Sequence, residues 1–154
     1  MTYPRLVIDK EAVLANAAAL QSMGAQQHIH ITPVVKALAG YDELIRDIAA
    51  LGFSRIGDSS LLHIRNYADI SAEKWLLRSP MVCEIPQLLA LTDGALISEE
   101  RLLRELEAEA KQQGKEYKVI LMAELGDLRE GCDQQELIRL SVVAESLPHV
   151  HLEG

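Results

Sequence analysis

The chain has 154 residues, a length typical of one domain and long enough to bury a core without disulfides. Its net charge of −8 argues against a nucleic-acid or anionic-membrane surface, because both need basic patches. Hydrophobic residues make up 49% and aromatic residues 4%, so we expect an aliphatic core in a soluble protein that acts on small molecules.

The sequence lacks the usual signals for export or membrane insertion. It has no apolar stretch of about 18 residues, and its first residues do not follow the signal-peptide pattern. Cys83 and Cys132 show no CxxC spacing and are interpreted as free thiols. We therefore expect a cytoplasmic protein with no membrane partner.

Short apolar runs alternate with helical patterns along the whole chain. Strands are predicted at residues 5–9, 30–37, 53–58, 74–80, 94–98, 117–125 and 150–154. Helices are predicted between them, at residues 10–24, 41–52, 59–68, 83–92, 99–114 and 133–147. Gly24 and Gly52 are predicted to close the first two helices, Ser59 or Ser60 to cap the third, and Ser98 to cap the helix at 99–114.

This alternation predicts an α/β fold with parallel strands, for which two architectures compete. A doubly wound dinucleotide-binding sheet would show a glycine-rich phosphate turn, and no GxGxxG or GxxxxGK[ST] occurs. A complete (β/α)₈ barrel takes about 250 residues. We expect one incomplete TIM-type barrel domain over residues 1–154, which supplies six barrel strands and stops within the sixth.

In both architectures the active site lies at the carboxyl ends of the parallel strands. The polar residues that the pattern places there are Lys36, Asp58, Ser59, Arg78, Ser98, Glu124, Asp127, Arg129 and Glu130. Asp58, Ser59 and Ser60 open a helix, and N-capping explains them most simply.

Lys36 follows the apolar run Ile31 to Val35 directly. Burial among apolar neighbours disfavours an ammonium group, and a neutral amine can attack a carbonyl to form a Schiff base. The alternative is a lysine that emerges from the sheet and pairs with a carboxylate such as Glu124. Spacing alone leaves both interpretations open.

Arg78 and Arg129 also stand at predicted strand ends. A guanidinium there can bind a carboxylate or phosphate at two points, or it can form a structural ion pair. Gly126 and Gly131 flank Arg129, which fits either a close backbone approach to a ligand or a plain tight turn.

The histidines include two HxH pairs, His28/His30 and His149/His151. Each pair could share one face of a strand, but no HExxH or cysteine-rich spacing supports it. The first pair precedes its apolar run, so it should lie at the opposite end from Lys36. We therefore predict no metal site.

Several segments together resemble the alanine-racemase-type, fold-type III enzymes. They are "LVIDKEAVLANAAAL", "TPVVKALAG" and "ELGDLREG", which occur in the family's order, and "RIGDSS" and "WLLRSPM", which point to its ornithine-racemase-like branch. The resemblance covers essentially the whole chain. It implies a barrel portion of an amino-acid racemase that uses pyridoxal 5'-phosphate (PLP).

By this resemblance, Lys36 would bind PLP covalently and act as one acid/base in moving the α-proton. Arg129 would lie near the phenolic oxygen of the cofactor, and Arg78 would meet substrate or cofactor. The family's tyrosine that reaches the phosphate is displaced here by one residue, which leaves a role for Tyr41 open. The family's phosphate-binding turn and second base come from later segments, so we expect the chain alone to be inactive as a racemase.

Three functions follow from these observations. The leading one is a PLP-dependent amino-acid racemase, with a basic amino acid as substrate and a homodimer as the expected assembly. The second is a PLP-binding homeostasis protein without turnover, which would keep Lys36 but need no second base. The third is a Schiff-base lyase that works without PLP.

Overall fold

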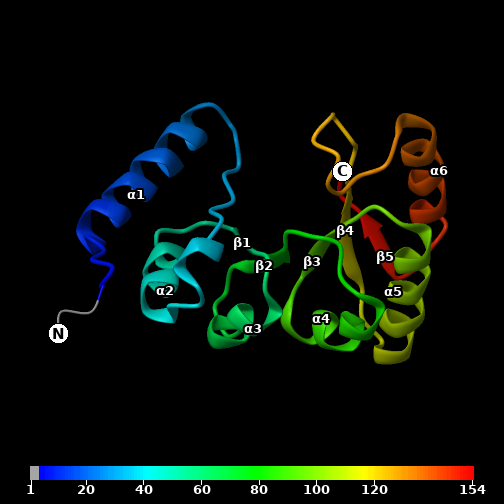
Figure 1. The fold of residues 1–154 in the computed structure, drawn as a ribbon, viewed down its shortest axis with the longest axis horizontal. Coiled ribbons are helices and arrows are strands. Elements are labelled where there is room, and N and C mark those ends of the chain that lie inside the picture. The colour runs from blue at the N-terminus through cyan, green and yellow to red at the C-terminus, as the bar shows by residue number, and fades with distance from the viewer. Residues whose placement is uncertain (1–3) are drawn as a thin grey trace.

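The computed structural model describes residues 4–154, in which five parallel strands form one sheet (Figure 1). The strands are β1 (Arg55–Asp58), β2 (Glu73–Leu76), β3 (Gly94–Ile97), β4 (Tyr117–Leu121) and β5 (Val150–Leu152). Their order in the sheet is their order in the chain, and every neighbouring pair is parallel. A doubly wound sheet reverses its strand order, so this unbroken order is that of a (β/α) barrel.

Helices connect the strands and lie in an arc along one side of the sheet (Figure 1). The α-helices are α1 (Lys10–Gln26), α2 (Asp42–Ala50), α3 (Leu61–Ile64), α4 (Ile85–Leu91), α5 (Glu100–Gln113) and α6 (Gln134–Glu145). Short 3₁₀ helices occur at η1 (Lys36–Leu38), η2 (Arg65–Tyr67) and η3 (Val82–Glu84). No described helix is long and apolar enough to cross a membrane.

The core lies between this arc of helices and the sheet. In α5, Leu102, Leu103, Leu106 and Ala110 recur at three- and four-residue spacing, and all four are buried. They pack in one cluster with strand residues such as Val119. Because the helix buries one stripe and the strand is covered on that face, the crossover is fixed against the sheet.

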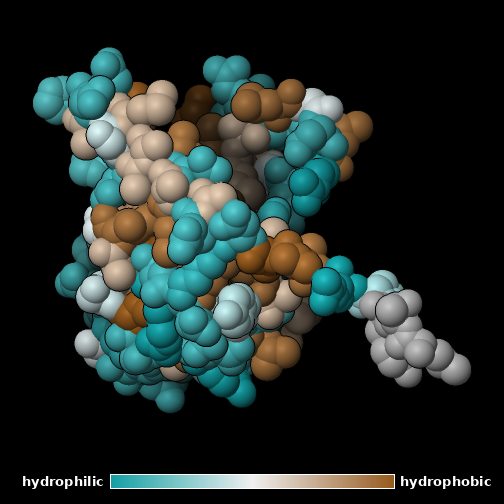
Figure 2. All heavy atoms as spheres, turned by 90° about the vertical axis from the view of Figure 1, so that its left-hand side faces the viewer, coloured by the Kyte–Doolittle hydropathy of each residue, from teal (hydrophilic) through white to brown (hydrophobic). Residues whose placement is uncertain are grey.

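The first two predicted strands are not strands in the structure. Residues 5–9 are irregular, and Leu6 and Val7 are 84% and 74% exposed; Figure 2 shows apolar side chains on the surface next to this N-terminal segment. Residues 30–37 form a single parallel bridge, Val34 to Gly57. Strands need hydrogen-bonded neighbours, and no described segment pairs with residues 5–9.

Some predicted helix ends are correct and others are not. Ser60 caps α3, accepting a hydrogen bond from the His63 N–H, and Gly52 follows the end of α2 with φ 91°. Gly24 does not close α1, which continues to Gln26, and Ser98 does not cap α5, whose N-cap is Glu99. The Ser98 hydroxyl instead contacts the Ser79 hydroxyl at 3.1 Å.

Candidate functional site

Lys36 lies at the carboxyl edge of the sheet, beside the end of β1. The backbone hydrogen bonds of Gly57 place it there: the Val35 N–H donates to the Gly57 carbonyl at 2.8 Å, and the Gly57 N–H donates to Pro33 at 2.9 Å. Val35 is buried and Lys36 begins the 3₁₀ turn η1. The sequence-predicted lysine therefore stands where a barrel carries its active site.

The surroundings of Lys36 differ from those that the apolar run suggested. Its side chain is exposed rather than partly desolvated. It forms no ion pair with another residue in 4–154, and Glu124 hydrogen-bonds instead to the backbone N–H groups of Gly126 and Leu128. The amine is therefore not held by the carboxylate that was its alternative partner.

Asp58, at the end of β1, is fully buried. Its Oδ1 accepts from the N–H groups of Ser59 at 2.6 Å and Ser60 at 3.0 Å, and its Oδ2 accepts from the Tyr67 hydroxyl at 3.0 Å. His63 Nδ1 lies 3.5 Å from Oδ1 without a well-aligned hydrogen bond. Burial, and next the negative charge of Asp58, raise the pKa of Tyr67, which keeps the phenol a donor. Asp58 thus organises the turn into α3 rather than facing a ligand.

Arg78 forms the structural ion pair that was its alternative interpretation. Its Nη1 and Nη2 donate to the two carboxylate oxygens of Glu84 at 2.8 and 2.7 Å, and its Nε donates to the Ser59 carbonyl at 2.9 Å. The Arg78 guanidinium holds the pKa of Glu84 below its ordinary value. Because both terminal nitrogens of its guanidinium are bonded to Glu84, Arg78 links the segment after β2 to η3.

Arg129 lies in the exposed loop that follows β4. The loop starts and ends at a parallel bridge between Ala123 and Cys132. The Leu128 N–H, with that of Gly126, lowers the pKa of Glu124, and this carboxylate fixes the loop backbone from inside. The Arg129 side chain itself is exposed and has no hydrogen bond or ion pair with residues 4–154.

Glu130 brings this loop over the neighbouring strands. Its Oε2 accepts from the Ser79 N–H at 2.9 Å, directly after Arg78, although β3 lies between the two segments in the sheet. The structure thus gathers Arg78, Ser98 and the Arg129 loop at one edge. The sequence did not point to Glu84, which binds Arg78, or to Tyr67, which binds Asp58. The only signal for Glu84 was the presence of an acid six residues after Arg78.

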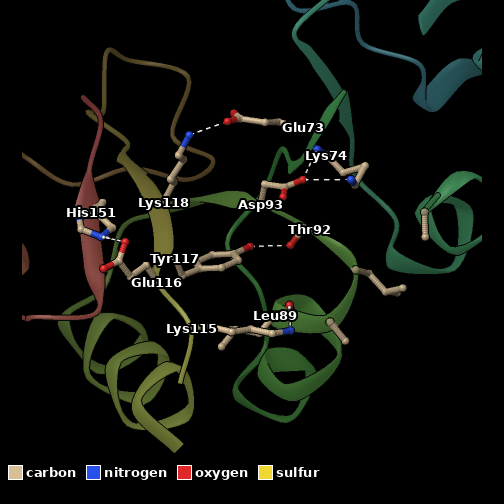
Figure 3. A pocket seen from close by; sticks show the side chains of 13 residues that line it. Glu73, Lys74, Leu89, Thr92, Asp93, Lys115, Glu116, Tyr117, Lys118 and His151 are labelled. Carbon is tan, nitrogen blue, oxygen red and sulfur yellow. Dashed lines mark hydrogen bonds and ion pairs between the residues drawn. The ribbon is translucent and has the colours of Figure 1, made fainter. Parts of the chain in front are cut away.

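The opposite end of the sheet has a pocket of about 440 Å³, shown in Figure 3. Six of its charged groups form ion pairs, Lys74 with Asp93 at 3.2 Å, Lys118 with Glu73 at 2.5 Å, and His151 with Glu116 at 3.0 Å, and Lys115 donates to the Leu89 carbonyl at 3.0 Å. Tyr117 and Thr92 share a hydrogen bond of 2.6 Å at its floor. Each lysine of this pocket therefore has a hydrogen-bond or ion-pair partner, unlike Lys36 at the carboxyl edge.

The HxH pairs do not converge on a common point. His28 and His30 line a pocket of about 450 Å³ beside α1, and His149 pairs with Glu107 at 2.7 Å. Within residues 4–154 no group of three or more His, Cys, Asp or Glu side chains could hold a metal ion. Cys83 is exposed, and Cys132 is buried with its pKa raised by desolvation.

Consecutive parallel strands joined by helical crossovers define the class of (β/α) barrel proteins, and Lys36 lies at the carboxyl edge of this barrel. Residues 8–154 match the model of the alanine racemase N-terminal domain, and the chain belongs to that family. The fold is accordingly an incomplete (β/α)₈-type barrel.

Two racemases are similar in sequence. The ornithine racemase of Acetoanaerobium sticklandii is 28% identical over 140 residues, which cover 91% of this chain and 40% of that protein. The lysine racemase of Thermotoga maritima is 27% identical over 133 residues, covering 85% of this chain and 38% of that protein. The chain therefore spans about two fifths of the length of these relatives.

The fold is shared with solved structures at lower identity. The D-threonine aldolase of Filomicrobium marinum superposes with a TM-score of 0.84 at 15% identity, covering 98% of this chain and 42% of that protein. Similarity at this level of identity shows a common fold, and the reaction has to be inferred from the residues of the site.

Proposed function

We propose that the chain is the cofactor-bearing barrel portion of a PLP-dependent amino-acid racemase, with Lys36 as the covalent attachment point. The observation that carries this proposal is the position of Lys36: it directly follows Val35, whose N–H is bonded to Gly57 of β1 at the carboxyl edge, and its amine has no carboxylate partner in residues 4–154. Membership of the family and the two racemase relatives support the same reaction.

The residues at this edge fit a flat, carbonyl-bearing cofactor. A primary amine supplies the attachment, and Ala37, Ala39 and Gly40 follow it with little side-chain bulk. When bound, PLP supplies an electron sink that makes the α-proton of an amino acid acidic. The chain's own part is to hold the cofactor through Lys36 and to take or return that proton at the Lys36 Nζ.

The arginines have different parts in this proposal. Arg129 is unpaired within residues 4–154 and would supply a cation to the phenolic oxygen of the cofactor, as the resemblance implies. Arg78 is engaged with Glu84, so it acts by fixing the edge of the site on which substrate and cofactor lie. The proposal assigns no phosphate-binding residues to this chain.

A basic amino acid is the proposed substrate. The two relatives are named for ornithine and lysine, and the mouth loop offers the exposed carboxylate Asp127 to a cationic side chain. We further propose a cytoplasmic homodimer as the working form.

A second function is PLP binding without turnover. Racemisation needs a second acid/base on the other face of the substrate, whereas a binding protein would need Lys36 and no second base.

The test is to incubate the 154-residue protein with PLP, reduce it with borohydride and locate the adduct by peptide mass. Stoichiometric label on Lys36 that is absent from Lys36→Ala supports the proposal, whereas label spread evenly over all lysines contradicts it. Lys111→Ala, which removes an exposed lysine of α5, is the matched control and should label like the wild type. Racemisation of L-ornithine or L-lysine by the PLP-loaded protein before reduction would establish an enzyme, because borohydride fixes the cofactor on Lys36 and abolishes turnover.

A further inference from the structure

The turn that carries Lys36 has an unusual backbone. The 3₁₀ turn η1 is followed by its C-cap Ala39, with φ 48°, and then by Gly40, with φ 77°. Two successive residues are therefore in the left-handed region, where a residue with a Cβ is strained. A strained conformation persists where neighbouring contacts hold it in place.

One side chain holds this turn. Among residues 4–154, the side-chain hydrogen bond to the backbone of residues 36–40 comes from Asn66, whose Nδ2 donates to the Gly40 carbonyl at 3.1 Å. The contact depends on glycine, because a Cβ at position 40 would lie 2.9 Å from that Nδ2 and 3.3 Å from the His63 Cα. The end of the Lys36 turn is thus fitted against the Asn66 amide.

Asn66 is itself fixed from the other side. Arg46, on α2, donates from Nη2 to the Asn66 carbonyl at 3.0 Å. The same guanidinium binds both carboxylate oxygens of Asp69, at 2.7 and 2.9 Å. A chain of polar contacts therefore runs from Asp69 through Arg46 and Asn66 to Gly40, and it joins α2 and η2 to the Lys36 turn.

We propose that Asn66 is a positioning residue for Lys36. Its amide holds the Gly40 carbonyl, and this fixes the direction in which the Lys36 side chain leaves the sheet. The inference depends on the proposed function, in which Lys36 binds a carbonyl cofactor. Asn66→Asp tests it directly, because aspartate keeps the shape of the side chain, loses the N–H donor and sets a carboxylate against the Gly40 carbonyl.

The experiment compares two lysines within the same molecule. The full chain is treated with PLP and borohydride at limiting time, and the label on Lys36 is divided by the label on Lys111. The ratio should fall by roughly 3- to 10-fold in Asn66→Asp, the size of effect that one hydrogen bond supports. Asn66→Gln, which keeps an amide on a longer stem, should recover part of it. Ser146→Ala, which removes a side-chain hydrogen bond to the Val143 carbonyl in α6, should leave the ratio unchanged.

The ratio separates positioning from simple stabilisation. A merely structural Asn66 would lower the unfolding midpoint in Asn66→Asp and leave the Lys36 to Lys111 ratio as in the wild type, which would overturn the inference. If wild-type Lys36 is not labelled preferentially, the proposed function fails first and the inference with it. Should Asn66→Asp not fold by circular dichroism, Gly40→Ala carries the test, because its methyl group displaces the Asn66 amide and should lower the ratio too.

Discussion

Arg55 donates from Nη2 to Oε2 of Glu153 across 2.5 Å, although 98 residues separate them in the chain. Arg55 begins β1 and Glu153 directly follows β5, so four strand spacings lie between them in the sheet. In a flat sheet that distance would be about 19 Å, too far for two side chains to touch. The contact therefore shows that the sheet curls, and that its two outer strands converge on the concave side.

Glu73 is the centre of the charge network on this concave side. It accepts from Arg55 Nε at 2.9 Å, from Trp75 Nε1 at 3.1 Å and from Lys118 Nζ at 2.5 Å, the last contact being visible in Figure 3. The Arg55 guanidinium also lies 4.7 Å from the centre of the Trp75 ring. Burial alone would raise the pKa of Glu73, but the hydrogen bonds from Lys118 and Trp75 outweigh it and lower the pKa.

Glu73→Gln should destabilise the fold by about 1–3 kcal/mol, because three donors lose their shared carboxylate. A lowered carboxyl pKa stabilises the native state above the ordinary value of 4.5, and that contribution is lost as pH falls through the depressed pKa. Urea denaturation at pH 7 and at pH 3 measures both effects. The wild-type and variant stabilities should approach each other at the lower pH.

Glu116→Gln is the matched control for this network. Glu116 pairs with His151, but its side chain is 73% exposed, so the change should stay within about 0.5 kcal/mol. An equal decrease in the free energy of unfolding in Glu73→Gln and Glu116→Gln would show that the three hydrogen bonds to Glu73 add no stability beyond that of an exposed pair.

Arg78→Lys should destabilise the protein by about 1–2 kcal/mol, because an ammonium cannot bind both Glu84 oxygens and the Ser59 carbonyl at once. Thermal unfolding measures the loss. Arg104→Lys, at an exposed pair with Glu100 in α5, should cost far less. An unchanged unfolding temperature in Arg78→Lys would mean that the Arg78 guanidinium is not needed for stability and is free to bind a ligand.

The sequence allowed the α/β class, the last five strands and the position of Lys36 to be predicted, because these depend on local periodicity. An apolar run such as Val119 to Leu121 forms a strand wherever neighbours pair with it. Residues 6–8 form an apolar run of the same kind but have no described pairing partner, so the pattern alone predicted a strand that is absent. Pro33 lacks an N–H, which limits the ladder that residues 30–37 can form.

The contacts that hold the candidate site are non-local and could not be predicted. Ser79 meets Glu130 across 51 residues, and Asn66 meets Gly40 across 26. No periodic pattern encodes such pairs. The exposure of Lys36 was missed for a related reason, since burial depends on which segments cover the mouth and not on the apolar run before it.

Gly131 and Gly126 offer a matched test of the loop that carries Arg129. Both have positive φ, 139° and 108°, so alanine is strained at either position. A Cβ at Gly131 would also lie 2.8 Å from the Glu124 backbone nitrogen, whereas a Cβ at Gly126 meets open space. Gly131→Ala should therefore cost more than Gly126→Ala, by about 1 kcal/mol or more in urea denaturation. The reverse order would contradict the loop geometry.

Tyr67→Phe should lower the free energy of unfolding by about 1–3 kcal/mol, because it leaves the Asp58 Oδ2 buried without its donor.

The Tyr67→Phe variant should also change how stability responds to alkali. Burial raises the pKa of Tyr67 in the folded state above the ordinary 10.0, so its contribution is complete below that value and is lost as pH rises past it. Burial raises the pKa of Tyr117 as well, so Tyr117→Phe should have the same effect and supplies the comparison. Denaturation curves between pH 8 and pH 11, values that bracket a tyrosine pKa of about 10, should show a shallower alkaline loss in each single variant and the shallowest in the double variant. An unchanged slope in Tyr67→Phe would indicate that the Tyr67 phenol does not stay protonated as a donor to the Asp58 carboxylate.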